Sequence, residues 1–200
     1  MDFQTHLKKY LSDEQIAKLL DSLNGFDKHA LLLNTDKMSE EALLKLYPSL
    51  EKHPIVKNGF LYDKNALQLG KSVLHELGAF YLQEPSAMLV SYLLNPEPNS
   101  FMLDLCAAPG GKSVQSSLLM NGTGLIISND ISYPRAKIIK ENAERMGLSN
   151  LLIISNDFSK LYLKYQNSFD SIILDAPCSG SGMFRKNDLM KQDWSINKVY

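Results

Sequence analysis

The pattern of hydrophobic and polar positions changes near residue 100. Beyond that point, short apolar runs alternate with longer segments of helical periodicity, which is typical of a parallel sheet with crossover helices. We predict strands over residues 100–106, 124–130, 151–157 and 169–175, and helices over 112–121, 133–147 and 158–166. The second half of the chain is therefore expected to form an α/β domain.

The first 77 residues have mostly helical patterning and no glycine-rich loop. Ser12 and Ser39 are expected N-cap residues of helices within 12–23 and 39–50, and a third helix is expected over about 70–79. We predict a small, mainly helical N-terminal domain over residues 1–77, followed by a second domain over 78–200.

Each predicted strand of the second half ends in or near an aspartate, namely Asp104, Asp130, Asp157 and Asp175. Aspartate commonly ends strands because it suits turns, and one such residue would need no further explanation. The carboxyl ends of parallel strands, however, meet at one edge of the sheet, where α/β proteins bind their ligands. Four acids in register favour a shared ligand crevice.

A glycine-rich loop, "CAAPGGK" at residues 106–112, connects the first predicted strand to its helix. Small residues allow the backbone to approach a ligand closely, and the helix N-terminus turns its N–H groups toward it. A dinucleotide fold would require GxGxxG, which is absent. A phosphate-binding P-loop matches Gly111, Lys112 and Ser113, but Cys106 stands in place of its first glycine.

S-adenosylmethionine is the third ligand class that such a loop could serve. It contains a ribose and an amino acid carboxylate but no phosphate, so an acid after the second strand would accept hydrogen bonds from the ribose hydroxyls. Asp130 occupies that position, and Asp157, after the third strand, would lie near the adenine amino group. This ligand fits the acids, while the P-loop interpretation stays open.

The amino-acid composition further narrows the classes of protein and partner that fit this sequence. The 200 residues are 44% hydrophobic and 22% charged with a formal net charge of −1, so there is no overall basic field that would indicate a nucleic-acid partner. The two cysteines support neither a disulfide framework nor a metal site. An apolar signal segment is absent from the polar N-terminus, and no run approaches roughly 18 apolar residues. We therefore expect a cytoplasmic protein that does not contact a membrane.

The segments "LDLCAAPGGKS", "SNDISYPRAKIIKENAERMG", "NDFS" and "ILDAPCSGSGMFRK", in this order and spacing, resemble the Sun-type RNA cytosine-5 methyltransferases, especially bacterial enzymes that act on small-subunit ribosomal RNA. The similarity covers about residues 78–198. It implies a Rossmann-like class I methyltransferase fold dependent on S-adenosylmethionine, of which four strands are visible. The residues it assigns to the cofactor are Cys106, Ala107, Ala108, Pro109, Gly110, Gly111, Lys112, Asp130, Asp157 and Asp175.

Cytosine carbon 5 is a poor nucleophile, so its methylation needs a thiolate that adds to carbon 6. From chemistry alone we would assign that role to Cys178, which follows Asp175 by three residues. The resemblance instead implies that Cys178 assists product release, while the attacking cysteine lies in a "TC" motif that would follow Tyr200. We accordingly expect this chain to be an inactive fragment of a longer enzyme.

The implied partner is RNA, and ribosomal RNA in particular. Arg185 and Lys186 follow the predicted active-site loop and are candidates for phosphate contact, and Trp194 could stack on a base. Arg135 is a further RNA-binding candidate, although its predicted helix also carries acids and favours a solvated face. Two alternatives to the RNA methyltransferase function stay open, a P-loop-like nucleotide hydrolase and a noncatalytic RNA- or cofactor-binding remnant.

Overall fold

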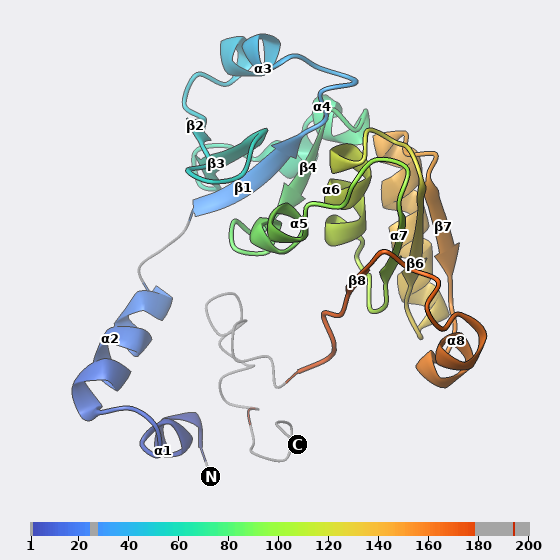
Figure 1. The fold of residues 1–200 in the computed structure, drawn as a ribbon. Helices are drawn as coiled ribbons and strands as arrows, with labels where there is room; N and C mark the ends of the chain where they lie inside the picture. The colour runs from blue at the N-terminus through green and yellow to red at the C-terminus, as the bar shows by residue number, and fades with distance from the viewer. Residues whose placement is uncertain (1, 25–27, 179–193, 195–200) are drawn as a thin grey trace. The chain divides into compact units, whose positions relative to one another are not determined.

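The computed structural model describes residues 2–24, 28–178 and 194 (Figure 1). The chain divides into two units: one comprises Lys28–Asp175, and the other combines Met1–Asp27 with Ala176–Tyr200. The larger unit contains both sheets of the described chain.

A parallel four-stranded sheet forms the second half of the larger unit, as predicted. Its strand order is β7-β6-β5-β8, and each neighbouring pair is parallel. Helices connect the strands in the expected sequence, which confirms the α/β class. The elements are α5 (Met88–Leu94), β5 (Phe101–Asp104), α6 (Gly111–Leu119), β6 (Leu125–Asn129), α7 (Tyr133–Met146), β7 (Leu151–Ile154), α8 (Phe158–Lys164) and β8 (Ser171–Ile173).

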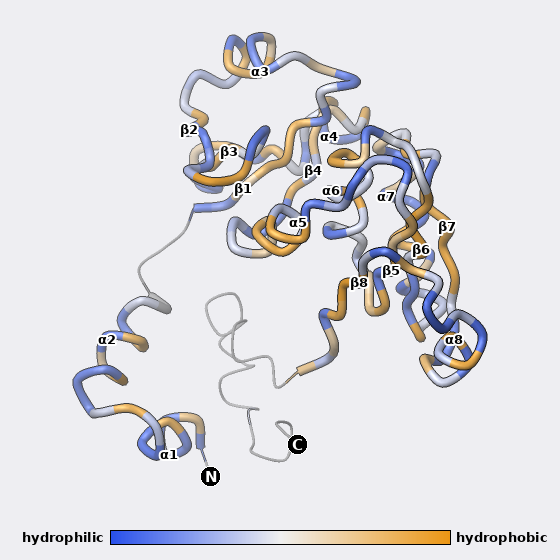
Figure 2. The backbone as a smooth tube through the Cα atoms, in the orientation of Figure 1, coloured by the Kyte–Doolittle hydropathy of each residue, from blue (hydrophilic) through white to orange (hydrophobic). Residues whose placement is uncertain are grey.

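Alternating side chains of this sheet bury both of its faces. Met102 of β5 packs with Met120 at the end of α6, whereas the next residue, Leu103, packs with Leu161 of α8. Because helices pack against both faces, most strand positions are apolar, and Figure 2 shows their hydrophobic colouring. Helix α7 has Pro134 in its first turn and ends at Gly147, which adopts a left-handed conformation with φ 76°.

An antiparallel sheet precedes this domain, and it corrects the expectation of a mainly helical N-terminal part. Its strands are β1 (Lys28–Leu33), β2 (Glu51–Lys52), β3 (Gly59–Asp63) and β4 (Phe80–Gln83), in the order β2-β3-β1-β4. Strand β4 lies just beyond the predicted boundary at residue 77, so one sheet spans both predicted parts. The division into 1–77 and 78–200 stays a prediction.

The helices expected before residue 77 are present but short. Helix α2 (Asp13–Asn24) and helix α3 (Glu40–Leu46) begin directly after Ser12 and Ser39, as predicted. The third expected helix consists of a 3-10 turn, η1 (Leu69–Lys71), and the single-turn helix α4 (Val73–Glu76).

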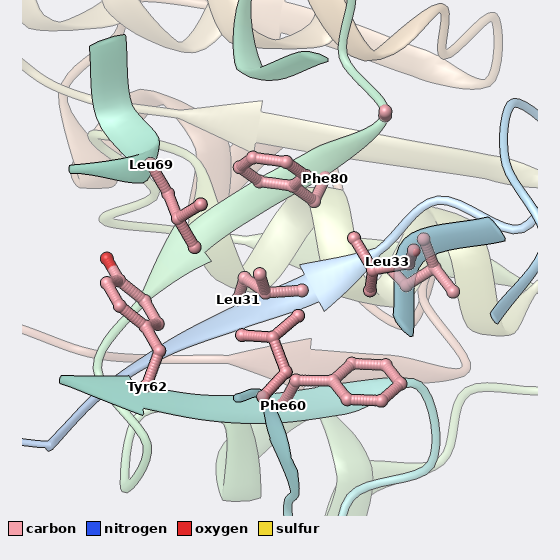
Figure 3. Close-up of a cluster of buried hydrophobic side chains, with 9 residues drawn as sticks. Leu31, Leu33, Phe60, Tyr62, Leu69 and Phe80 are labelled. Carbon is pink, nitrogen blue, oxygen red and sulfur yellow. The ribbon is translucent and has the colours of Figure 1, made fainter. Parts of the chain in front are cut away.

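Strand β1 is buried on both faces. Leu31 and Leu33 point into a core with Phe60 and Phe80, which Figure 3 shows. The alternate residue Leu32 belongs to a second core that includes residues of α5 and α6. A run of consecutive leucines therefore forms a central strand, which hydrophobic periodicity cannot distinguish from a buried helix.

Side chains from the end of β1 connect this sheet to helix α7. The Asn34 side-chain amide donates to the carbonyl oxygens of Gly78 at 3.1 Å and Met146 at 2.9 Å. The Lys37 ammonium donates to the carbonyl oxygens of Leu77 and Arg145, both at 2.8 Å. The carbonyls of Arg145 and Met146, at the end of α7, thus accept hydrogen bonds from the segment that follows β1.

The smaller unit contains α1 (Phe3–Leu7) and α2. Trp194 packs edge-on against Phe3, with ring centroids 5.3 Å apart, and lies 5.5 Å from the ring of His6. Its side chain is buried. Trp194 thus packs within its own unit, and the stacking of its ring on an RNA base stays a prediction.

Candidate cofactor site

Two buried carboxylates and one exposed carboxylate follow neighbouring strands at the same edge of the parallel sheet. Asp104 is the last residue of β5, Asp130 directly follows β6, and Asp175 follows β8 by two residues. Asp104 and Asp130 are 0% and 2% exposed, whereas Asp175 is exposed. The convergence that the strand pattern predicts is therefore present for these three acids.

The glycine-rich loop is supported from two sides. Gly110 has φ 106°, and a Cβ atom there would lie 3.2 Å from the Ile139 side chain of α7. A Cβ atom on Gly111 would lie 3.1 Å from the ring of Tyr81 in β4. The side-chain amide of Asn142 donates to the carbonyl oxygen of Pro109 at 2.9 Å. A side chain at either glycine would therefore be crowded by its neighbour, and these contacts hold the loop at the start of α6.

Asp130 is held by its own turn and by α7. Its Oδ1 accepts the backbone N–H of Ser132 at 3.0 Å, and its Oδ2 lies 3.2 Å from Nη1 of Arg135. The other guanidinium nitrogen of Arg135 donates to the carbonyl oxygen of Ala108 at 3.1 Å. Arg135 thus connects the aspartate to the glycine-rich loop and is only half exposed. Its RNA-binding role stays a prediction.

Lys112 makes an ion pair with Asp175, in which Nζ and Oδ2 are 2.5 Å apart. The lysine side chain is 18% exposed and the aspartate side chain 60% exposed. In a P-loop the corresponding lysine contacts phosphates. Here its ammonium is occupied by a carboxylate, which lowers its capacity to attract a second anion.

Asp157 has a structural role that the sequence pattern did not separate from ligand binding. It is the N-cap of α8, and its Oδ1 accepts hydrogen bonds from the backbone N–H of Ser159 at 2.8 Å and from its hydroxyl at 2.6 Å. These bonds hold the pKa of the Asp157 carboxyl below its ordinary value. The adenine contact expected of Asp157 stays a prediction.

Burial raises the pKa of two neighbouring groups, the Asp104 carboxyl at the end of β5 and the Cys106 thiol in the loop. The pKa of Asp104 is raised from 3.8 to about 6, chiefly by burial and against the effect of its hydrogen bond from Ser113. Burial, together with the nearby Asp130 and Asp104, also raises the pKa of the Cys106 thiol. The thiol is therefore protonated at neutral pH, which suits a structural loop residue better than a nucleophile.

Asp104 makes folding stability depend on pH. The carboxyl ionises near pH 4 in the unfolded chain but near pH 6 in the folded one, so the folded state holds an extra proton between these values. We expect the free energy of unfolding of the ligand-free protein to fall by about 1 kcal/mol per pH unit as the pH rises through this window. Denaturant titrations should show a flatter dependence for Asp104→Asn, and equal slopes for the two proteins would contradict this.

The other residues predicted to act at the site lie in the smaller unit or outside the residues that the structure describes. Cys178 is an exposed free cysteine of the unit formed by the chain ends, so its catalytic role stays a prediction. Arg185 and Lys186 lie outside the described residues. Sequence reasoning missed Asn142 and Tyr81, because nothing in a pattern of polar or aromatic residues indicates which loop they touch.

The part of the chain that the structure describes contains neither a candidate metal cluster nor a helix able to cross a membrane. Among the described residues, no group of three histidine, cysteine, aspartate or glutamate side chains could hold a metal ion. Within the same residues, every helix is too short or too polar to cross a membrane.

Family models match almost the whole chain. Residues 91–199 match the 16S rRNA methyltransferase RsmB/F model, and residues 1–85 match the model of the N-terminal domain of the 16S rRNA methyltransferase RsmF. The first of these matches covers the parallel sheet from β5 onward, including the glycine-rich loop and all three strand-end acids.

Relatives and solved structures agree with these matches. The chain is 38% identical to a tRNA (cytosine(49)-C(5))-methyltransferase of Pyrococcus abyssi, over 100% of this chain and 68% of that protein. It is 36% identical to the ribosomal RNA small subunit methyltransferase F of Shewanella frigidimarina, over 86% of this chain but 37% of that protein. It therefore spans little more than a third of the latter's length.

A methyltransferase homologue from Pyrococcus horikoshii superposes with a TM-score of 0.76 at 28% identity, covering 88% of this chain and 59% of that chain. NSun6 from the same organism superposes with a TM-score of 0.88 at 19% identity, covering 99% and 75%, which shows the shared fold. The sequence matches and the strand-end geometry together place the chain in the RsmB/F family of 16S rRNA methyltransferases.

Proposed function

We propose that this chain is the cofactor-binding part of an RNA cytosine-5 methyltransferase that uses S-adenosylmethionine. The observation that carries the proposal is Asp130, a buried carboxylate that directly follows β6 and is connected through Arg135 to the glycine-rich loop. A buried acceptor at this edge suits the paired hydroxyls of a ribose, and the helix N-terminus behind the loop suits the carboxylate of an amino acid.

The residues present fit S-adenosylmethionine better than they fit a nucleoside triphosphate. Asp104 and Asp130 are buried beside the loop, and the ammonium of Lys112 is already paired with Asp175. A triphosphate would bring several negative charges to this acidic edge and would be repelled. S-adenosylmethionine carries no phosphate and has a positive sulfonium, so the same carboxylates would attract it.

The bound cofactor would supply an electrophilic methyl group, and the residues of this chain would orient it. In the proposed arrangement Asp130 holds the ribose, residues 106–112 surround the amino acid end, Asp157 lies near the adenine, and Asp175 completes the pocket. Support of the loop by Ile139 and Asn142 of α7 would help to orient the bound cofactor.

RNA is the proposed substrate, and the match of residues 1–85 to the N-terminal domain of a 16S rRNA methyltransferase favours ribosomal RNA. The similarity to a tRNA methyltransferase makes transfer RNA the comparison to test. For Cys178 we propose assistance in releasing the methylated product, with Arg185 and Lys186 on RNA phosphates. Arg135 contacts Asp130 and the loop residue Ala108, so we propose that it orders the cofactor site, and its contact with RNA stays a prediction.

Calorimetric titration of the whole chain with S-adenosylmethionine, and separately with ATP and Mg²⁺, tests the cofactor assignment. We expect saturable one-to-one binding of S-adenosylmethionine and no binding heat with ATP. Binding of ATP with loss on removal of Mg²⁺ would support the P-loop alternative and overturn the assignment. Binding of RNA without either small molecule would instead support a noncatalytic RNA-binding role.

A further inference from the structure

A chain of buried hydrogen bonds joins two strands of the parallel sheet to the helix behind the glycine-rich loop. The hydroxyl of Ser128 in β6 donates to the hydroxyl of Ser113 in α6 at 2.8 Å. The Ser113 hydroxyl donates in turn to Oδ2 of Asp104 in β5 at 2.7 Å. All three side chains are 0% exposed. Asp104 is therefore fixed in position at the end of its strand, below the loop.

The second carboxylate oxygen of Asp104 has no such partner. Oδ1 is fully buried and makes no hydrogen bond to any residue that the structure describes. A buried carboxylate oxygen without a donor is costly, and a native structure keeps one only where something compensates it. The unpaired oxygen brings no gain in folding stability, because Asp104 destabilises the ligand-free protein once it ionises.

Neighbouring charged groups compensate the Asp104 carboxylate only in part, because Lys112 lowers its pKa whereas Asp175 and Asp130 raise it. Lys112 on α6 is the nearby cation, and its ammonium is paired with Asp175. Asp130, after β6, adds negative charge and is itself paired with Arg135 of α7. The thiol of Cys106 in the loop is neutral when protonated and negative when ionised, so it cannot offset the carboxylate in either state. A positive ligand would supply the missing compensation.

We infer that Asp104 is a specificity-determining residue that makes the site prefer the positively charged cofactor over its neutral product. This inference rests on the proposed function. S-adenosylmethionine carries a sulfonium, whereas S-adenosylhomocysteine, formed by loss of the methyl group, carries a neutral thioether. The two molecules are otherwise alike, so a fixed negative charge nearby stabilises the first more than the second. Release of the product then needs no change in the shape of the site.

The charge preference is tested by measuring how tightly the whole chain binds S-adenosylmethionine and S-adenosylhomocysteine. We expect the ratio of the Kd of S-adenosylhomocysteine to the Kd of S-adenosylmethionine to fall about tenfold in Asp104→Asn at pH 8. In the wild-type chain the same ratio should fall as the pH is lowered from 8 to 5, because Asp104 becomes protonated. The pH dependence should be absent in the variant.

Two serine variants serve as matched controls, and they keep the test decisive if Asp104→Asn does not fold. Ser113→Ala removes the hydrogen bond that favours the ionised carboxylate, so the midpoint of the pH dependence should move upward. Ser128→Ala leaves that bond in place and should not move the midpoint. Both serines are equally buried, so a purely structural effect would be similar in the two variants.

The outcomes separate this inference from the proposed function. If Asp104→Asn weakens both molecules by the same factor, or if the wild-type ratio does not change with pH, the charge preference is refuted and the cofactor assignment stands. If the wild-type chain binds neither molecule, the cofactor assignment itself fails and the inference fails with it.

Discussion

Gly78→Ala is expected to lower the free energy of unfolding by about 4 kcal/mol or more. Gly78 has φ +70°, and a Cβ atom there would lie 2.0 Å from the carbonyl oxygen of Arg145. This contact is with backbone at the end of α7 and cannot be relieved by a change of side-chain rotamer. The Asn34 amide also donates to the Gly78 carbonyl, so a displaced Gly78 would lose that bond as well.

Gly122→Ala is the matched control for this prediction. Gly122 has a similar φ of +68°, but a Cβ atom there would meet nothing within 4 Å. The substitution Gly122→Ala should lower the free energy of unfolding by only about 1 kcal/mol, the strain of a left-handed backbone conformation. Chemical denaturation of both variants measures the difference. If the two substitutions destabilise the protein equally, then the close approach between Gly78 and α7 is not what determines the effect.

Asp130→Ala is expected to weaken the binding of S-adenosylmethionine by about 100-fold or more, because two hydrogen bonds from the ribose hydroxyls to a buried charge would be lost. The substitution also removes the partner of Arg135, which holds the loop through the carbonyl oxygen of Ala108. Calorimetric titration of the folded variant measures the affinity, and circular dichroism establishes that it is folded.

The control for Asp130 is Asp170→Asn. Asp170 also accepts a backbone hydrogen bond, from the N–H of Phe101 at 2.7 Å, but it lies at the opposite end of the sheet, where β5 and β8 begin. We expect Asp170→Asn to leave the cofactor affinity unchanged within about twofold. A similar loss of affinity in both variants would indicate a general effect of the sheet and would argue against a ribose contact at Asp130.

The parallel half of the molecule could be predicted from the sequence because each of its strands is bounded by a clear signal. An aspartate stands at or shortly after the end of each strand, and segments of helical periodicity separate the strands. The antiparallel sheet could not be predicted, because its strands carry no alternation. Leu31 and Leu32 point to opposite cores, so strand β1 is apolar at every central position. The loops between these strands also contain short helices, which dominated the pattern.

The candidate site was predictable where the position in the chain determines the position in space. Asp104, Asp130 and Asp175 follow parallel strands, so they meet at one edge. Side-chain partners were not predictable: Asp157 caps its own helix, and Arg135 reaches back to the carbonyl oxygen of Ala108. Both outcomes depend on rotamers and on packing between segments that are far apart in the chain.

Helix α7 is held at both ends, and this limits how the protein can be divided. Arg135 in its first turn and Asn142 farther along support the glycine-rich loop, while its last carbonyls accept hydrogen bonds from Lys37 and Asn34 in the segment that follows β1. The two family matches are separate, ending at residue 85 and beginning at residue 91. A cut between them would nonetheless leave the helix end without its donors and expose an apolar face of α6. The two matched segments are thus not interchangeable modules, and an exchange of one between relatives would have to preserve the partners of α7.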